Sequence, residues 1–329
     1  MVLVLHADFQ ALGEPTAEDI VSTPFTSFIK VFLEVASIVA VNVFILISGW
    51  FGIKPSKKGL LKFVFQVLFF SLGIYIVMLL VGKKQFLISD FAHCFVQLPG
   101  TSYWFIPSYL CLWLFAPVLN SFIVYADKKT YISVLVAFFA FQSVYSFIFN
   151  GASFLMKGYS AMSFMGLYLL AAFCKKHMDL NKYNVSDFAL GYLVISLLQT
   201  IIFVFAKYWG YSAISSRICC YSNPLNILSA LLLLLCFSKI SFKSKVVNQI
   251  AMSCFAVYLL HCNPFMYSYY LDSIRCISSS NVLFKILYIL LCICIWFIIS
   301  ILLDRLRSLI WKLLPHTINA IALYTNAKK

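Results

Sequence analysis

Two histidines stand out in an otherwise apolar chain, because imidazole can accept and release protons near neutral pH. His6 lies in the segment "MVLVLHADFQ" and His261 lies in "AMSCFAVYLLHCNPF". This side chain is the one best suited to general acid–base catalysis. An ionisable group inside hydrocarbon is costly and is therefore a functional candidate by default. We take both histidines as candidate catalytic residues.

Each histidine also has a plainer interpretation. His261 can equally well hold the helices together through a hydrogen bond to a neighbouring helix. His6 lies near a helix end, where a histidine is often simply solvated. Asp8 can orient His6 only if the helix has already ended, because residues two positions apart do not share a helix face. Glu34, early in an apolar run, can reach the lipid headgroups in a similar way.

The residues around His261 add polar groups to the same place. Tyr258 lies one helical turn before His261, and Ser253 and Val257 share the histidine's face of the helix. Pro264 follows, and because proline has no amide to donate, a backbone carbonyl near His261 loses its usual partner. Tyr258 is therefore a candidate to contact a ligand beside His261.

The composition excludes an ordinary soluble domain. Of the 329 residues, 63% are hydrophobic and 11% are charged, which predicts an all-α polytopic membrane protein. The net charge of +14 would suggest nucleic acid in a soluble protein, but here it indicates basic cytoplasmic loops and contact with anionic lipid. The 11 cysteines show no metal or disulfide framework, and most of them, Cys262 included, lie in apolar runs as small hydrophobes.

The apolar runs predict a transmembrane helix bundle of nine complete spans, since a bilayer needs about 20 apolar residues per helix. Residues 1–6 are expected to be the outer remnant of a further helix, placed first and truncated. The predicted spans lie near residues 29–51, 60–81, 103–125, 131–149, 160–176, 187–208, 222–239, 250–271 and 283–304.

The lysines and arginines predict the orientation, because cytoplasmic loops are rich in them. Most of the 25 basic residues lie in alternate connections and in the tail. The connection at residues 7–28 has four acids and no base. We therefore expect the C-terminus to be cytoplasmic, His6 to lie near the outer face of a plasma membrane, and residues 306–329 to form a cytoplasmic amphipathic tail on the membrane surface.

Other polar side chains in or beside the spans are candidates for contact with a substrate. Asn42 and Ser48 lie in "VNVFILISGWF", where Gly49 permits close helix approach. Trp104 opens a span at the outer interface, although an aromatic belt explains a tryptophan there without any function. A lysine run at the cytoplasmic surface can bind lipid or the phosphates of an anionic cosubstrate. Its members are Lys54, Lys57 and Lys58.

Along nearly its whole length the chain resembles the acyltransferase-3 family of integral membrane acyltransferases, which includes surface-polysaccharide O-acetyltransferases. The resemblance depends on His6 in the first helix and on "VFILISGWF", which is similar to the family's FF-x-x-SG-aromatic segment. It also depends on "YWFIPSYLCLWLFAPVLN", on "YSNPLNILSALLLLLCF" and on "SCFAVYLLHCNP", in the family's order.

The resemblance implies a membrane acyltransferase domain over residues 1–305. It implies transfer of an acyl group, usually acetyl, from cytoplasmic acyl-CoA to a hydroxyl of a polysaccharide or a lipid-linked glycan at the outer face. His6 matches the family's essential catalytic residue, and His261 matches a second recurring histidine. Acetyl-CoA would be a cosubstrate, and no bound cofactor is expected. A covalent acyl-imidazole and a direct transfer both stay open.

Two further hypotheses stay open beside the enzyme. One is a transporter or flippase for lipid-linked sugar, with His261 as a proton relay, although no pair of broken segments in two matching halves supports it. The other is an inactive, N-terminally truncated family member. The family pairs its first-helix histidine with an arginine about three turns earlier, which would lie before Met1. The sequence predicts neither the acceptor sugar nor the oligomeric state.

Overall fold

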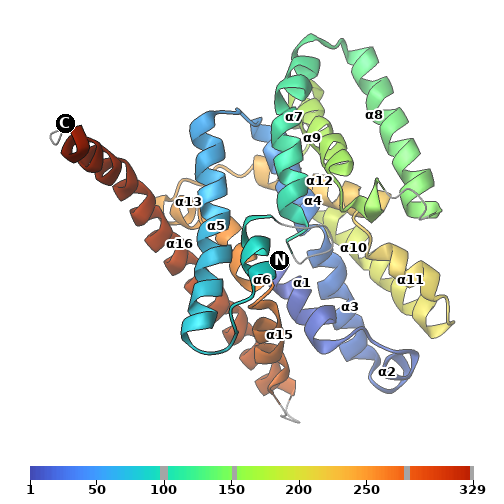
Figure 1. The fold of residues 1–329 in the computed structure, drawn as a ribbon. Coiled ribbons are helices and arrows are strands. Elements are labelled where there is room, and N and C mark those ends of the chain that lie inside the picture. The colour runs from blue at the N-terminus through green and yellow to red at the C-terminus, as the bar shows by residue number, and fades with distance from the viewer. Residues whose placement is uncertain (97–102, 150–153, 278–281, 327–329) are drawn as a thin grey trace. The chain divides into compact units, whose positions relative to one another are not determined.

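The computed structural model describes residues 1–96, 103–149, 154–277 and 282–326, and in these ranges every regular element is a helix (Figure 1). The predicted all-α class is confirmed. The chain divides into two compact units. The first unit is Met1–Pro55 with Trp104–Phe242, and the second is Ser56–Tyr103 with Lys243–Lys329.

The first unit is a bundle in which α4 packs against α9 and α12, α10 packs against α3 and α12, and α7 packs against α9. Its chain begins with a single α-helical turn that continues as a π-helix, η1. The elements are α1 (Val2–Leu5), η1 (His6–Leu12), α2 (Ala17–Ser22), α3 (Pro24–Ile38), α4 (Ala40–Phe51), α7 (Phe105–Tyr125), α8 (Lys128–Gln142), η2 (Ser143–Ile148), η3 (Met156–Gly158), α9 (Ala161–His177), η4 (Leu180–Lys182), α10 (Val185–Tyr208), α11 (Ser212–Ile218) and α12 (Pro224–Ser238).

In the second unit α14 packs against α5 and α16, and α15 packs against α16. The long helix α16, red in Figure 1, continues past residue 305 without a break, and the interfacial role of residues 306–329 stays a prediction. The elements are α5 (Lys57–Leu80), α6 (Ile88–Phe95), α13 (Lys245–Ala251), α14 (Cys254–His261), α15 (Tyr267–Arg275) and α16 (Val282–Asn326).

Six helical stretches of the described residues are long and apolar enough to cross a membrane. They correspond to six of the nine predicted spans, and the count of nine stays a prediction. Of the other three, two correspond to the shorter helices α9 and α12, of 17 and 15 residues. The six stretches are Pro24–Phe51, Lys57–Leu80, Phe105–Tyr125, Lys128–Ile148, Val185–Tyr208 and Leu283–Leu313.

The remaining predicted span, near 250–271, is not one helix. Helix α14 ends at His261 and α15 begins at Tyr267. Pro264 cannot donate an amide hydrogen bond, and the Asn263 side chain accepts from the Phe265 backbone amide at 2.9 Å, which is a local turn that competes with the helix. The break therefore has a local cause in the sequence.

A close approach of backbones joins α4 to α9. A Cβ atom on Gly49 would lie 2.8 Å from the Tyr168 Cα and still closer to the Tyr168 carbonyl oxygen. Only glycine leaves room for this contact, because small residues are what allow the backbones of packed helices to touch. Helix packing thus explains the glycine of the Ser-Gly pair in "ISGWF".

We expect Gly49→Ala to lower the thermal stability of the detergent-solubilised protein, because overpacking costs about 1–3 kcal/mol. Gly73→Ala is the matched control, since a Cβ atom on Gly73 in α5 meets nothing within 4 Å. The control should melt at or slightly above the wild-type temperature, because alanine favours a helix interior. A Gly49→Ala protein that melts at the wild-type temperature would contradict the close contact.

Candidate functional site

A pocket of about 390 Å³ lies in the first unit where the C-terminal ends of α4, α7 and α9 meet. Connections that follow these three helices are among the lysine-rich ones that the sequence places on the cytoplasmic side. The lining residues are Gly49, Trp50, Phe51, Gly52, Asn120, Ile123, Tyr168, Ala172, Lys175 and Lys176.

A closed ring of hydrogen bonds fixes one wall of this pocket. The Tyr168 hydroxyl accepts from the Ile53 backbone amide at 2.9 Å and donates to the Asn120 side-chain oxygen at 2.6 Å. The Asn120 amide donates in turn to the Ile53 carbonyl at 2.9 Å. The chain turns at Gly52 with φ of 76°, a conformation that favours glycine. The turn after α4 is therefore held to α7 and α9 through both backbone groups of Ile53.

Two lysines at the end of α9 give the pocket its charge. Lys175 donates to the Trp50 carbonyl at 2.6 Å, and its ammonium lies 5.8 Å and 5.5 Å from the ring centres of Trp50 and Phe51. Lys176 donates to the Ile123 carbonyl at 2.5 Å. An ammonium has three N–H donors, so donors remain for an anionic ligand. The site can accept a phosphate ester with an aromatic or apolar neighbour.

The histidine that ends α9 is protonated less readily than a free imidazole. Burial lowers the pKa of His177, and the charges of Lys176 and Lys128 act in the same direction. Its ring packs beside Phe173 and Tyr131 at 4.8 Å and 6.2 Å between centroids. His177 does not line the pocket, and the positive charge that faces it comes from Lys175 and Lys176.

The predicted lysine run lies in exposed positions. Lys54 follows the turn at Gly52 in the first unit. Lys57 and Lys58 form the first turn of α5 in the second unit, where the Ser56 hydroxyl accepts from the Gly59 amide at 3.1 Å. The sequence analysis did not single out Lys175 and Lys176 as pocket residues, although a basic pair at a helix end was a usable signal.

Ser48 lies one residue before the pocket. Its hydroxyl donates to the Phe44 carbonyl at 3.1 Å and lies 3.4 Å from the Tyr109 hydroxyl. The Tyr109 ring contacts the Phe44 ring at 5.8 Å between centroids. Ser48 thus contacts α7 within the bundle, and a role toward a ligand stays a prediction.

Asn42 and Trp104 meet at a residue that the sequence analysis did not single out, Tyr221. The buried Asn42 amide donates to the Tyr221 carbonyl at 3.0 Å. The Trp104 ring stacks on the Tyr221 ring at 5.8 Å and lies 4.4 Å from the Tyr159 ring. Trp104 therefore packs against protein aromatics, which an interfacial belt alone does not explain. Tyr221 opens the matched segment "YSNPLNILS", and that was the available signal.

His6 begins the π-helix η1 and is half-buried. Because the helix continues to Leu12, the condition under which Asp8 could orient His6 is not met, and residues two apart lie on nearly opposite faces. Asp8 is buried, and within the described residues neither of its carboxyl oxygens has a hydrogen-bond partner.

Glu34 is also buried, at 5% exposure, so the interpretation that it simply reaches the headgroups is wrong. The Phe9 backbone amide donates to Glu34, while Glu34 Oε2 has no partner within the described residues. The charge of Lys30 acts on both Asp8 and Glu34, and the Lys30 ammonium donates to the Leu12 carbonyl at 3.2 Å. Helix η1 is therefore tied to α3 by polar groups as well as by packing.

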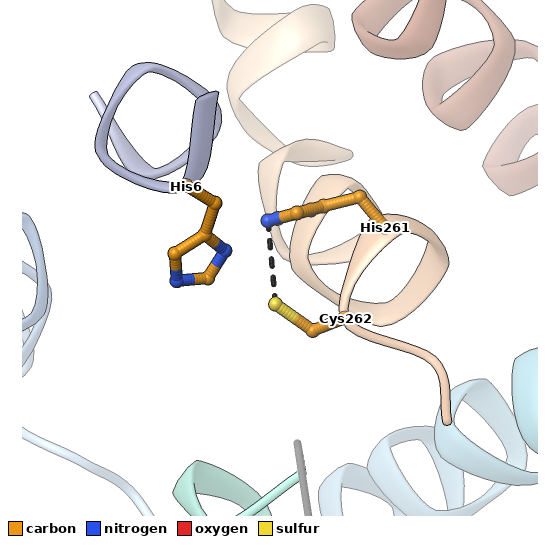
Figure 2. Close-up of side chains that lie close together, drawn as sticks. All are labelled: His6, His261 and Cys262. Atoms are coloured by element: carbon orange, nitrogen blue, oxygen red, sulfur yellow. Dashed lines mark hydrogen bonds between the residues drawn. The ribbon is translucent and has the colours of Figure 1, made fainter. Parts of the chain in front are cut away.

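His261 ends α14 in the second unit and is completely buried. Its Nδ1 lies 2.5 Å from the Val257 carbonyl oxygen, and its Nε2 lies 3.3 Å from the sulfur of Cys262 (Figure 2). Tyr258 and Tyr270 contact the ring edge-on, at 6.5 Å and 5.2 Å between centroids. Figure 2 also labels His6, which belongs to the first unit.

In a helix the amide of residue 264 would donate to the carbonyl of Leu260, four residues earlier. Because Pro264 has no amide hydrogen, the Leu260 carbonyl is the one that was expected to lack a partner. It accepts from the Asn263 backbone amide at 3.3 Å, so the expectation of a free carbonyl there is wrong. Sequence reasoning also missed Cys262 as a polar partner of His261. The signal was the direct His-Cys-Asn-Pro succession at a helix end.

The fold and these sites define a polytopic helical membrane protein with a basic pocket at its helix ends and buried histidine and carboxyl groups. A family model described as an acyltransferase domain matches residues 1–305, so the chain belongs to the acyltransferase-3 family and is a membrane acyltransferase. The resemblance stated from the sequence is confirmed. No curated protein and no solved structure matches the chain.

Replacing Tyr168 with phenylalanine should loosen the wall of the pocket. Loss of the hydroxyl leaves the Ile53 amide and the Asn120 oxygen each without a partner, which costs roughly 1–3 kcal/mol per buried group. We expect a lower melting temperature in detergent. Tyr125→Phe is the control, because Tyr125 at the end of α7 is 86% exposed. If the two variants melt at the same temperature, the closed ring of hydrogen bonds through Tyr168 contributes nothing to stability.

Proposed function

We propose that the protein is an O-acyltransferase that moves an acetyl or other short acyl group from cytoplasmic acyl-CoA to a hydroxyl of a cell-surface polysaccharide or lipid-linked glycan. The observation that carries the proposal is the family match over residues 1–305. The protein would act in the plasma membrane with its C-terminus in the cytoplasm and with membrane lipid and the glycan as partners.

The pocket of the first unit supports the choice of donor. Acyl-CoA carries phosphates and a flat adenine, and the pocket offers the ammonium groups of Lys175 and Lys176 beside the rings of Trp50 and Phe51. Acyl-CoA is a cytoplasmic metabolite, and the charge rule assigns this end of the bundle to the cytoplasm. Lys54, Lys57 and Lys58 would add to the positive field that attracts such an anion.

The chemistry needs one base. As the acceptor oxygen attacks the acyl carbonyl, its proton must be removed, and a histidine with an accessible lone pair can take it. We assign this role to His6, which matches the family's catalytic histidine. Asn42, Ser48, Trp104 and Tyr258 would contact the acyl group or the acceptor. Acyl-CoA is consumed as a cosubstrate, and no tightly bound cofactor is required.

Membranes that contain the protein should transfer label from radioactive acetyl-CoA to glycan, and His6→Ala should lower the rate by roughly 10²–10⁴-fold, the usual contribution of a general base. His93→Ala is the control, because His93 is an exposed histidine in α6. The amount of folded His6→Ala protein in the membrane should equal that of the wild type.

The outcomes of this assay separate the hypotheses. Full activity of His6→Ala would mean that the catalytic assignment is wrong. A wild-type protein that transfers no acyl group, while translocation of lipid-linked sugar depends on it, would favour the flippase. A wild-type protein with neither activity would favour an inactive family member.

The donor assignment predicts a kinetic effect of the pocket lysines. Lys175→Gln combined with Lys176→Gln should raise the KM for acetyl-CoA about tenfold or more with little change in kcat, because hydrogen bonds to charged groups contribute about 1.5–3 kcal/mol each. Lys182→Gln is the matched control, an exposed lysine in the same connection. An unchanged KM in the double variant would place the donor elsewhere.

A further inference from the structure

The pocket of the first unit has a simple chemical composition. Lys175 and Lys176 line it, and among the described residues no acidic side chain does. The Asn120 amide and the Tyr168 hydroxyl also line it, but they are engaged with each other and with the Ile53 backbone. Polar recognition in this pocket therefore depends mainly on two ammonium groups, which favour anions.

Hydrogen bonds hold both ammonium groups at the pocket. Lys175 donates to the Trp50 carbonyl at 2.6 Å, and Lys176 donates to the Ile123 and Val124 carbonyls at 2.5 Å and 3.3 Å. Since an ammonium has three N–H donors, these bonds within the described residues leave two donors on Lys175 and one on Lys176. An anion in the pocket therefore meets positive charge from both lysines.

Two aromatic rings lie beside one of these charges. The Lys175 ammonium is 5.8 Å from the centre of the Trp50 ring and 5.5 Å from the centre of the Phe51 ring. Both aromatic residues also line the pocket. An anion held by Lys175 would thus have aromatic surface next to it, and nucleotide bases stack favourably on such surface.

The charge and the rings discriminate among the three parts of acyl-CoA. The pantetheine arm carries amides, but the neutral polar groups of the pocket are already engaged. Each phosphate of the diphosphate carries one charge, whereas the 3′-phosphate is a monoester with a charge of roughly −1.5 to −2 at pH 7. The 3′-phosphate also lies on the sugar that carries the adenine. A double charge beside a flat ring therefore matches the adenosine 3′-phosphate best.

The size of the pocket also favours one end of the molecule. Its volume of about 390 Å³ is near the lower limit for small-molecule sites, which is roughly 300 Å³. The space is bordered by Gly49, Gly52 and Ala172, none of which has a side chain larger than a methyl group. A compact nucleotide suits such a space better than a long flexible arm does.

We propose that this pocket is the adenosine 3′-phosphate subsite of the donor, with the monoester at Lys175 and Lys176 and the adenine against Trp50 and Phe51. This inference rests on the proposed function. It implies that the protein distinguishes CoA from 3′-dephospho-CoA. It also implies that the product CoA competes with acyl-CoA, because both molecules carry the same nucleotide end.

The experiment measures binding to the purified full-length protein in detergent by displacement of radioactive CoA. We expect 3′-dephospho-CoA to bind about tenfold more weakly than CoA or weaker still, because it lacks the group that the two lysines hold. Adenosine 3′,5′-bisphosphate should displace CoA although it has no pantetheine arm. Inorganic phosphate at the same concentration should not, because it gains nothing from the rings.

Variants test whether the lysines contact the ligand or only stabilise the helix ends. In Lys175→Gln combined with Lys176→Gln, the ratio of the affinities for CoA and 3′-dephospho-CoA should fall to about one, whereas purely structural lysines would weaken both ligands by the same factor. Lys182→Gln, an exposed lysine in the connection after α9, should keep the wild-type ratio. Trp50→Leu should weaken both ligands equally, since both carry adenine.

The wild-type measurement needs no variant, so misfolding of a variant does not protect the proposal. Equal affinities of the wild type for CoA and 3′-dephospho-CoA would overturn it, and so would an unchanged ratio in the double variant. Displacement of CoA by phosphatidylglycerol but not by adenosine 3′,5′-bisphosphate would also overturn it, in favour of a lipid headgroup site. Because binding needs no transfer, a protein that keeps the preference for CoA but transfers no acyl group would contradict only the proposed function.

Discussion

The contact of Gly49 with the backbone of Tyr168 is the constraint on which the first unit depends. It brings α4 and α9 together at backbone distance. Only then does the Tyr168 hydroxyl reach the Ile53 amide and the Asn120 side chain, and only then do the lysines at the end of α9 reach the last carbonyls of α4 and α7. The pocket is a consequence of one close helix pair.

The two pocket lysines serve the fold and the electrostatics at the same time. The final carbonyls of a helix have no partner inside that helix, and near a membrane they cannot all rely on water. Lys175 and Lys176 satisfy carbonyls of α4 and α7, where a positive charge also suits the negative end of the helix dipole. The same bonds hold two ammonium groups at the pocket, so stability here does not compete with anion binding.

The sequence was sufficient for the helical class, because apolar runs of about 20 residues dominate it. It also singled out His6, His261, Asn42 and Trp104 as polar or amphipathic groups in apolar surroundings. It was not sufficient to predict which residues these side chains contact. Tyr221 contacts both Asn42 and Trp104, and it lies 179 positions after Asn42 in the sequence, a separation that no local pattern can encode. Glu34 lies inside an apolar run, and only tertiary packing decides that it is buried rather than turned to the headgroups.

Many of the hydrogen-bond partners of the candidate residues are backbone groups. Sequence motifs list side chains, so they do not reveal these partners. Val257 orients His261 through its carbonyl, so its side chain carries no trace of that role. Cys262 in an apolar run has the composition of a small hydrophobe, and its sulfur lies beside Nε2 of His261 only because the helix ends there.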